Sequence, residues 1–214
     1  MTGTTSSFTI YVEKKRSYSD QARSTGDYLA HLFTLPALTA MRRILRYDGN
    51  GVPTDIISTA MSTVLSDPVT DTVYTDPPNL GDNRVFAVEY LPGQFDQRAD
   101  SAAEAIEILS GGMRPMVRVS EIYTVPNTIT DEQLKRVTDN IVNEVDSRLC
   151  DPFGPASFPA GGTAVPPVPL LERFFETSGA ELGLAMSPAD VEACRRYFQE
   201  DEHRVPTETE MRVL

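Results

Sequence analysis

The stretch VEKKRSYSDQARS at residues 12–24 has a counterpart 76 residues further along the chain, VEYLPGQFDQRAD at residues 88–100. Both stretches leave an alternating apolar segment, cross a short turn and enter a helical pattern near an Asp-Gln pair. The same offset aligns the flanking sequence without a gap. Nine identities result, in which Val12, Glu13, Asp20, Gln21, Arg42, Tyr47, Thr54, Asp55 and Val69 recur as Val88, Glu89, Asp96, Gln97, Arg118, Tyr123, Thr130, Asp131 and Val145. The offset therefore indicates an internal repeat.

Each copy also shows the same order of predicted elements. The first copy predicts a strand at 8–13, a helix from Asp20, a strand at 40–47, a DGNG turn at 48–51, a helix after Thr54 or Asp55 and a short strand near 72–74. The second copy predicts a strand at 85–90, a helix after Asp96, a strand at 116–123 and a helix after Thr130 or Asp131.

This order is typical of an α+β fold made of two ferredoxin-like β-α-β-β-α-β repeats, at about 8–76 and 84–150. Neither copy has enough apolar residues for a large core of its own. We therefore expect the copies to pack sheet to sheet as a pseudo-dimer within residues 1–150.

The C-terminal third has a different composition. Residues 151–169 are rich in Pro and Gly without periodicity, which predicts a linker over the surface. Residues 170–214 predict a helical segment, with a short helix at 170–180, a helix starting at Ser187-Pro188 and a last helix starting at Thr207. Because one turn of helix is marginal in water, we expect the last helix to continue in a longer parent chain.

The overall charge limits the classes of partner. The chain has 214 residues, a formal net charge of −12 and only two cysteines. Nucleic acids and anionic membranes bind clustered Lys and Arg, so we expect neither as a partner. The N-terminal residues lack the apolar segment of a secretory signal. Cys150 and Cys194 fit no metal-binding spacing, which favours a cytoplasmic protein with reduced thiols and no metal.

The predicted helix starts carry residues suited to accept hydrogen bonds from free backbone amides. Thr207 is followed three residues later by Glu210, as in a capping box. The predicted caps are Asp20, Asp96, Thr54, Thr130, Ser187 and Thr207.

The corner at residues 91–98 admits a structural and a functional interpretation. In the first, Pro92-Gly93 forms a turn with positive φ at Gly93, and Asp96 caps the following helix. In the second, the turn and the helix amides hold an anion, although Asp96 would compete for those amides. The first copy has no glycine at this turn, so Pro92, Gly93 and Arg98 are specific to the second copy. They are our candidates for contact with a substrate or a neighbouring domain.

Four arginines lie on equivalent predicted strands of the two copies: Arg42, Arg46, Arg114 and Arg118. They are either charges on a sheet surface or a shared basic patch for a phosphorylated small molecule. Arg42 and Arg118 recur at the 76-residue offset and are kept as candidate binding residues.

No catalytic constellation is predicted. The sequence contains no G-x-x-x-x-G-K-[ST] and no H-E-x-x-H motif, and neither His31 nor His203 has a motif partner. The acidic residues of EACRRYFQEDEHR at 192–204 are typical of a solvated helix face.

Several stretches resemble one enzyme family. FAVEYLPGQFDQRADSAAEAI at 86–106, IYVEKK at 10–15, AMRRILRYDGNGV at 40–52 and GLAMSPADVEACRRYFQEDEHRVPTETEMRVL at 183–214 look like the N-terminal region of the long, single-chain phosphoribosylformylglycinamidine synthases. In this family the N-terminal domain is similar to a dimer of the small S subunit of the split enzyme. The D-P-Q-G run of that subunit corresponds to Asp20-Gln21 and Asp96-Gln97, but both copies lack its Pro and Gly.

The resemblance implies a non-catalytic assembly module of a purine-biosynthetic ligase. The parent would convert formylglycinamide ribonucleotide, with ATP and glutamine, into formylglycinamidine ribonucleotide. Its ATP and Mg²⁺ sites, and a glutaminase domain that releases ammonia, would lie outside this chain. The partners implied are the synthetase and glutaminase domains of the same parent chain.

Two other classes of function are open at this point. Two ferredoxin-like halves can hold a ligand between them, which would make the chain a stand-alone small-molecule-binding regulatory module. RNA binding on an open sheet needs exposed aromatic residues and positive charge, and the charge of this chain argues against it.

Overall fold

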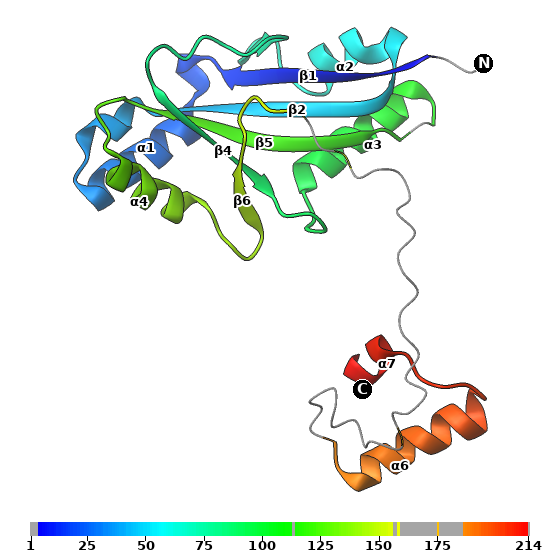
Figure 1. The fold of residues 1–214 in the computed structure, drawn as a ribbon. Coiled ribbons are helices and arrows are strands. Elements are labelled where there is room, and N and C mark those ends of the chain that lie inside the picture. Colours follow the sequence, from blue (N-terminus) through cyan, green and yellow to red (C-terminus); the bar gives the residue numbers. More distant parts are fainter. Residues whose placement is uncertain (1–3, 113, 156–157, 159–174, 176–185, 214) are drawn as a thin grey trace. The chain divides into compact units, whose positions relative to one another are not determined.

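The computed structural model of the chain describes residues 4–112, 114–155, 158, 175 and 186–213 (Figure 1). The chain divides into two compact units, residues 1–158 and 159–214. The first unit contains the repeat, and each unit is described by itself.

Each copy in the first unit has the order β-α-β-α-β, one strand fewer than the expected β-α-β-β-α-β order. Its strands and helices are β1 (Thr5–Lys14), α1 (Asp20–Phe33), β2 (Arg42–Pro53), α2 (Ile57–Thr63), β3 (Asp71–Tyr74), β4 (Arg84–Tyr90), α3 (Gln97–Ser110), β5 (Met116–Val125), α4 (Asp131–Ile141) and β6 (Ser147–Cys150). Short 3₁₀ turns at Arg16–Tyr18, Pro36–Ala40 and Thr54–Ile56 lie in the connections of the first copy.

The strands form one six-stranded antiparallel sheet in the order β3-β1-β2-β5-β4-β6. When 76 is added to each residue number, strand pairs of the first copy become strand pairs of the second. The pair Tyr11↔Arg46 becomes Ala87↔Ile122, and Tyr11↔Tyr74 becomes Ala87↔Cys150. The chain is therefore α+β, and its two copies are related in backbone pairing as well as in sequence.

The expected sheet-to-sheet packing of the copies is wrong. They join edge to edge, because β2 of the first copy pairs with β5 of the second over nine residue pairs, from Arg42↔Thr124 to Asn50↔Met116. Leu45 lies opposite Glu121, its own equivalent at the offset, so this pair marks the pseudo-two-fold axis. Edge pairing satisfies the backbone groups of two strands that would otherwise be exposed, which face-to-face packing would not do.

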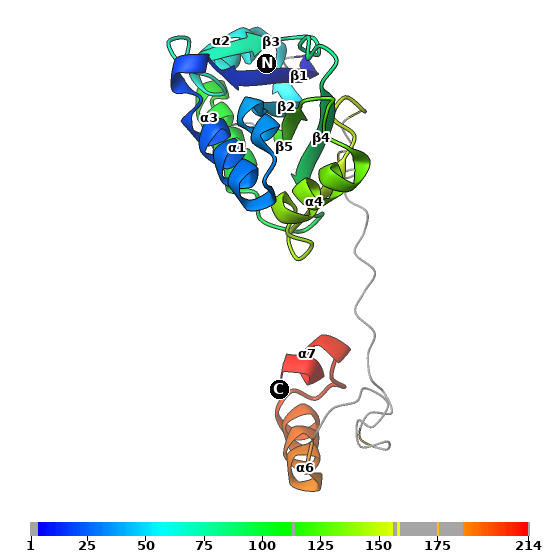
Figure 2. The same ribbon diagram turned by 90° about the vertical axis from the view of Figure 1, so that its left-hand side faces the viewer.

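All four helices pack on one face of the sheet (Figures 1 and 2). Helices α2 and α3 cover a cluster that includes Ile10, Tyr47 and Val119, whereas α1 and α4 cover a cluster around Phe86 and Tyr123. Strand residues two apart share a face, so the alternating pattern of each strand directs these side chains to the helices.

The opposite face of the sheet is partly covered by chain connections. Tyr11, Ile44 and Ile122 pack there with Leu80, from the connection between β3 and β4. Arg46 is buried on this face, where it pairs with Asp48 and donates to the backbone carbonyls of Asp151, Pro152 and Gly154. Part of the predicted 151–169 linker is therefore held against the sheet, and residues 156–157 and 159–169 lie outside the described residues.

The predicted DGNG turn at 48–51 is wrong, because β2 continues through it to Pro53. Strand β2 is central, so Asp48, Gly49 and Asn50 pair with β5, and Asp48 and Gly49 also with β1. Gly49 is needed for packing, since a Cβ there would lie 2.3 Å from Cε1 of Phe8. The glycine that suggested a turn makes room for an aromatic ring on the neighbouring strand.

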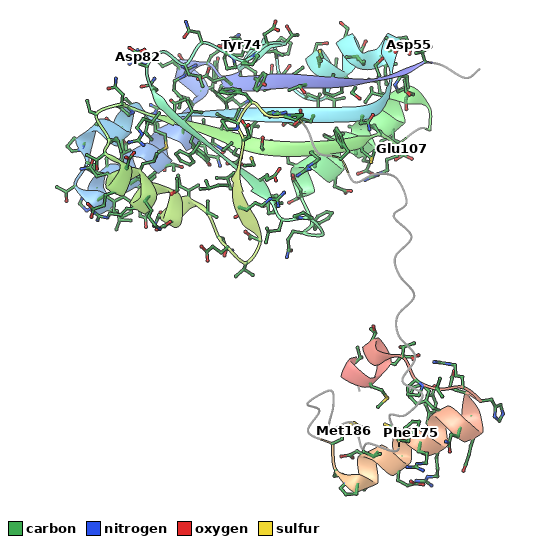
Figure 3. The ribbon with its side chains drawn as sticks, viewed as in Figure 1. Asp55, Tyr74, Asp82, Glu107, Phe175 and Met186 are labelled. Atoms are coloured by element: carbon green, nitrogen blue, oxygen red, sulfur yellow. The ribbon has the colours of Figure 1, made fainter. Side chains whose placement is uncertain are left out.

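The second unit contains helix α6 (Pro188–Arg196), a π-helical turn (Tyr197–Asp201) and helix α7 (Glu208–Val213). Phe198 and Met211 are buried against each other, with Phe175 and Met186 packed on them (Figure 3). The predicted helix at 170–180 lies outside the described residues except for Phe175. Across the residues that the structure describes, no helix has the length and apolarity that crossing a membrane requires.

Candidate functional site

The two equivalent helix starts differ in how their amides are satisfied. The Asp96 carboxylate accepts hydrogen bonds from the amides of Arg98 and Ala99, at 2.9 and 3.0 Å, so it caps α3 as predicted. Its pKa is raised by burial, against the effect of the amides. Asp20 is instead the first residue of α1, and no side chain caps that helix.

Two of the predicted caps are therefore wrong, and both lie in the first copy. A 3₁₀ turn precedes α1 and moves its start, so Asp20 points outward and pairs with Arg23. Another 3₁₀ turn separates Thr54 from α2, and the Thr54 hydroxyl donates to the Thr4 carbonyl instead.

The remaining predicted caps are confirmed. Thr130 and Gln133 form a reciprocal capping box at α4, and Ser187 forms one with Asp190 at α6. Thr207 and Glu210 exchange the same two bonds at α7.

The Pro92-Gly93 turn forms as expected. The Gln94 amide donates to the Leu91 carbonyl at 3.0 Å, and φ of Gly93 is 90°. Residues with this φ are almost always glycine, so the turn explains Gly93 without a ligand. Arg98 lines both of the clefts described below, whereas Pro92 and Gly93 are not among the residues that line them.

The structure does not bring Arg42 and Arg118 together. Arg42 lies opposite Thr124 in the ladder, six residues from Arg118, which is roughly 20 Å along a strand. Arg42 pairs with Glu13, and Arg118 pairs with Glu89, which is Glu13 at the offset. Each arginine thus belongs to an equivalent ion pair of its own copy.

The other two arginines of the hypothetical basic patch are also paired. Arg46 is buried with Asp48. Arg114 pairs with Asp100 and with Glu107, both of α3. The four arginines therefore do not form one shared patch.

A cross-copy ion pair that the sequence did not predict lies at the pseudo-two-fold axis. Arg43 of β2 donates through two nitrogens to the Glu121 carboxylate of β5, and Nε lies 2.8 Å from Oε2. The Tyr123 hydroxyl donates to the same carboxylate, and Arg43 also donates to the Gln21 side chain of α1. The arrangement joins both copies beneath the helices.

The pKa values of this group reflect its position. Burial alone would raise the pKa of Glu121, but the hydrogen bonds and charge of Arg43 outweigh it, and the pKa is lowered. Burial raises the pKa of Tyr123, and the charge of Glu121 adds to this. The pair is therefore ionised, and the tyrosine is neutral, at physiological pH.

Two clefts open on the helical face, one over each copy. The first-copy cleft, of about 1250 Å³, lies between the start of α1 and the end of α2, over β1 and β2. The second-copy cleft, of about 870 Å³, lies beside the start of α3, over β4 and β5. Both include Arg43, Tyr47 and Arg98, so they meet near the axis.

The charges of the two clefts are opposite. The first-copy cleft is lined by seven basic residues, Lys14, Lys15, Arg16, Arg23, Arg42, Arg43 and Arg98, and by three acidic ones, Glu13, Asp67 and Asp71. The second-copy cleft has two basic residues, Arg43 and Arg98, and four acidic ones, Glu89, Asp96, Glu121 and Asp146. A cationic cleft in a chain of net charge −12 is the least expected feature of this surface.

No described group suggests redox or metal chemistry. Within the described residues, no three His, Cys, Asp or Glu side chains come close enough to hold a metal ion. Burial and the nearby Glu89 raise the pKa of Cys150 to about 11, so its thiol is a poor nucleophile at neutral pH.

The comparisons with known proteins do not assign the chain to a family. No protein-family model matches the sequence, and the comparison with curated proteins found no match to it.

Proposed function

We propose that this chain is the N-terminal, non-catalytic assembly portion of a long, single-chain phosphoribosylformylglycinamidine synthase. Each copy would be a ferredoxin-like unit, and the pair would take the place of a small-subunit dimer. The observation that carries the proposal is the shared 76-residue offset in sequence and strand register, because a duplicated module is what the resemblance implies.

In this role the first unit would be a rigid platform between the synthetase and glutaminase domains. The ATP and Mg²⁺ of the parent would bind in the synthetase domain, so this chain would contribute position rather than chemistry. It would help to shape the substrate cleft and the passage of ammonia between the two domains.

Exposed apolar side chains on α1 and α3 suit such docking. Leu32 is 45% exposed and Ile108, its equivalent at the offset, is 75% exposed. Exposed apolar residues at equivalent positions of two helices are suited to contact a neighbouring domain.

The proposal is tested in the full-length parent by comparing the rate with glutamine and the rate with added ammonia. Replacing Leu32 and Ile108 by Asp is expected to lower the glutamine-dependent rate and to spare the ammonia-dependent one. The matched control replaces Val69 and Val145, which are also equivalent and exposed, by Asp.

Unchanged coupling of the two rates after deletion of residues 1–150 would contradict the proposal. Turnover of formylglycinamide ribonucleotide by the 214-residue chain alone would contradict it as well. A Ser-acid-His-Cys box in the coding sequence after Leu214 would support the family.

The second candidate is a stand-alone small-molecule-binding regulatory module. The cationic first-copy cleft favours it, since its volume suits an organic ligand. Calorimetry on the chain alone separates the candidates in part, because only the regulatory role requires that a ligand bind without other domains.

A further inference from the structure

We propose that the first-copy cleft binds an organic phosphate, with the phosphate at the start of α1 between Lys15 and Arg16 and the organic part toward Tyr47 and Arg98. The proposal concerns binding to this chain and does not rest on the proposed function.

The first argument is the surplus of positive charge that the protein itself does not neutralise. Lys14, Arg23, Arg42 and Arg43 of the cleft each pair with a carboxylate. The remaining three are Lys15, Arg16 and Arg98. None of them forms an ion pair within the described residues, but Arg98 interacts electrostatically with the carboxylates of Asp96 and Glu121.

These three side chains differ in how they are held. The Lys15 ammonium donates to the carbonyls of Pro68 and Val69, at 2.8 and 3.0 Å, which places it across the edge of the cleft. The side chains of Arg16 and Arg98 form no hydrogen bond or ion pair within the described residues. The Arg16 guanidinium can therefore turn toward a ligand without breaking a described contact, whereas Arg98 would give up part of its attraction to Asp96 and Glu121.

The nearby acidic groups do not cancel this charge. Asp67 lines the cleft, but it accepts a hydrogen bond from the Val69 amide, and it is one negative charge beside the two positive charges of Lys15 and Arg16. Asp71 is occupied by Lys14, and Asp20 by Arg23.

The second argument is the uncapped start of α1, which opens into the same cleft. Ser19, Gln21 and Ala22 line the cleft. The Ser19 hydroxyl donates to the Arg16 carbonyl, so it does not cap the helix. Free amides at the start of a 14-residue helix favour an anion there. At the equivalent position of the second copy, Asp96 already occupies the amides.

The third argument concerns the body of the ligand. Val12, Leu45, Val64 and Tyr47 form an apolar part of the lining. A cleft of about 1250 Å³ is far larger than a free phosphate requires. An organic phosphate of nucleotide size matches both the charge and the apolar lining.

The test measures binding to the 214-residue chain by calorimetry and by amide chemical shifts. The probes are AMP, ribose 5-phosphate and inorganic phosphate, with adenosine and ribose as uncharged counterparts. We expect saturable binding of AMP and ribose 5-phosphate, with shifts concentrated at residues 15–23, and weaker binding of inorganic phosphate. The affinity should fall as salt is added.

Variants separate a built site from general charge attraction. Arg16→Gln and Arg98→Gln should each weaken AMP binding by about fivefold to tenfold, the usual effect of losing one charge-assisted contact. The matched control is Lys135→Gln, which removes one positive charge from α4, outside both clefts. The affinity of this variant for AMP should stay within about twofold of the affinity of the unchanged chain.

Three outcomes would overturn the inference. These are no saturable binding of any phosphorylated probe up to roughly 1 mM, equal binding of adenosine and AMP, or equal weakening by Lys135→Gln. Each leaves the proposed assembly role untouched, because that role is measured by coupling of two rates in the parent enzyme.

Discussion

The two copies share their backbone pairing but differ at the corner between the first strand and the first helix. In the second copy a Pro-Gly turn leads to Asp96, whose carboxylate occupies the helix amides. In the first copy a Lys-Lys-Arg run and a 3₁₀ turn lead to a helix without a side-chain cap. The same backbone framework thus has one corner whose helix amides are bonded to Asp96 and one corner whose helix amides are uncapped beside basic residues. The two copies therefore share their strand pairing but differ in local charge.

The largest expected effect comes from the ion pair that joins the copies. Glu121→Leu gives the second copy the residue that the first has at Leu45, but it leaves Arg43 unpaired with a side chain only 12% exposed. We expect a loss of about 3 kcal/mol in the free energy of unfolding. Urea denaturation measures it.

A symmetric double variant is the control for this prediction. Arg43→Val with Glu121→Leu makes both positions match their equivalents, Val119 and Leu45. We expect most of the lost stability to return, because no charge is then left unpaired. A double variant as unstable as Glu121→Leu would mean that the ion pair itself, rather than the unpaired arginine, governs the loss.

The next effect concerns Gly49, which lies where the second copy has Val125. Gly49→Val is expected to cost about 2 kcal/mol, because the new side chain overlaps the buried ring of Phe8. Adding Phe8→Ala should make the valine tolerable, so the two costs should not add. Additive costs in a double-mutant cycle measured by urea denaturation would contradict the packing argument.

A smaller effect separates the two aspartates at equivalent positions. Asp96→Ala should cost about 1 kcal/mol, because two amides of α3 lose their acceptor. Asp20→Ala should change stability by only a few tenths of a kcal/mol, since Asp20 caps nothing and is exposed. Thermal and urea unfolding of both variants measure the difference. Equal costs would remove the distinction between the two corners.

The smallest effect is on the acid side of the stability profile. Since the folded-state pKa of Glu121 is lowered, its contribution to stability is complete above the unfolded pKa of 4.5 and is lost as pH falls through the folded value. The wild type should therefore lose up to about 1 kcal/mol more than the Arg43→Val/Glu121→Leu variant between roughly pH 7 and 3. Asp96 is present in both proteins, so its opposite shift largely cancels. If the free energy of unfolding fell by the same amount in both proteins over this pH range, the prediction would be wrong.

The comparison also shows where sequence reasoning succeeded. Alternating apolar residues and helical spacing predicted the main strands and helices of both copies, because those patterns record which face of each element is buried. The caps at Asp96, Thr130 and Ser187 followed from local chemistry alone. The predicted caps at Asp20 and Thr54 were wrong, because a 3₁₀ turn displaces the start of each helix, and no residue type in the sequence predicts such a turn.

The candidate sites were harder to predict. Arg42 and Arg118 were chosen for their recurrence, but recurrence reflects equivalent ion pairs with Glu13 and Glu89. The Lys-Lys-Arg run at 14–16 was visible in an acidic chain, yet its importance depends on the free helix start beside it. Arg98 was predicted for its turn, whereas the structure places it in the lining of both clefts.

By itself the sequence determined the duplication, the places of the main strands and helices and most helix starts, since these depend on contacts between residues close in the chain or on a pattern repeated at one offset. Only the tertiary structure decided that the copies share one sheet, that Gly49 makes room for Phe8 and that Arg43 meets Glu121. It also decided that one corner is closed by its own aspartate while the other opens into a cationic cleft. These outcomes depend on which distant residues become neighbours, and such neighbours are set by the packing of whole strands and helices.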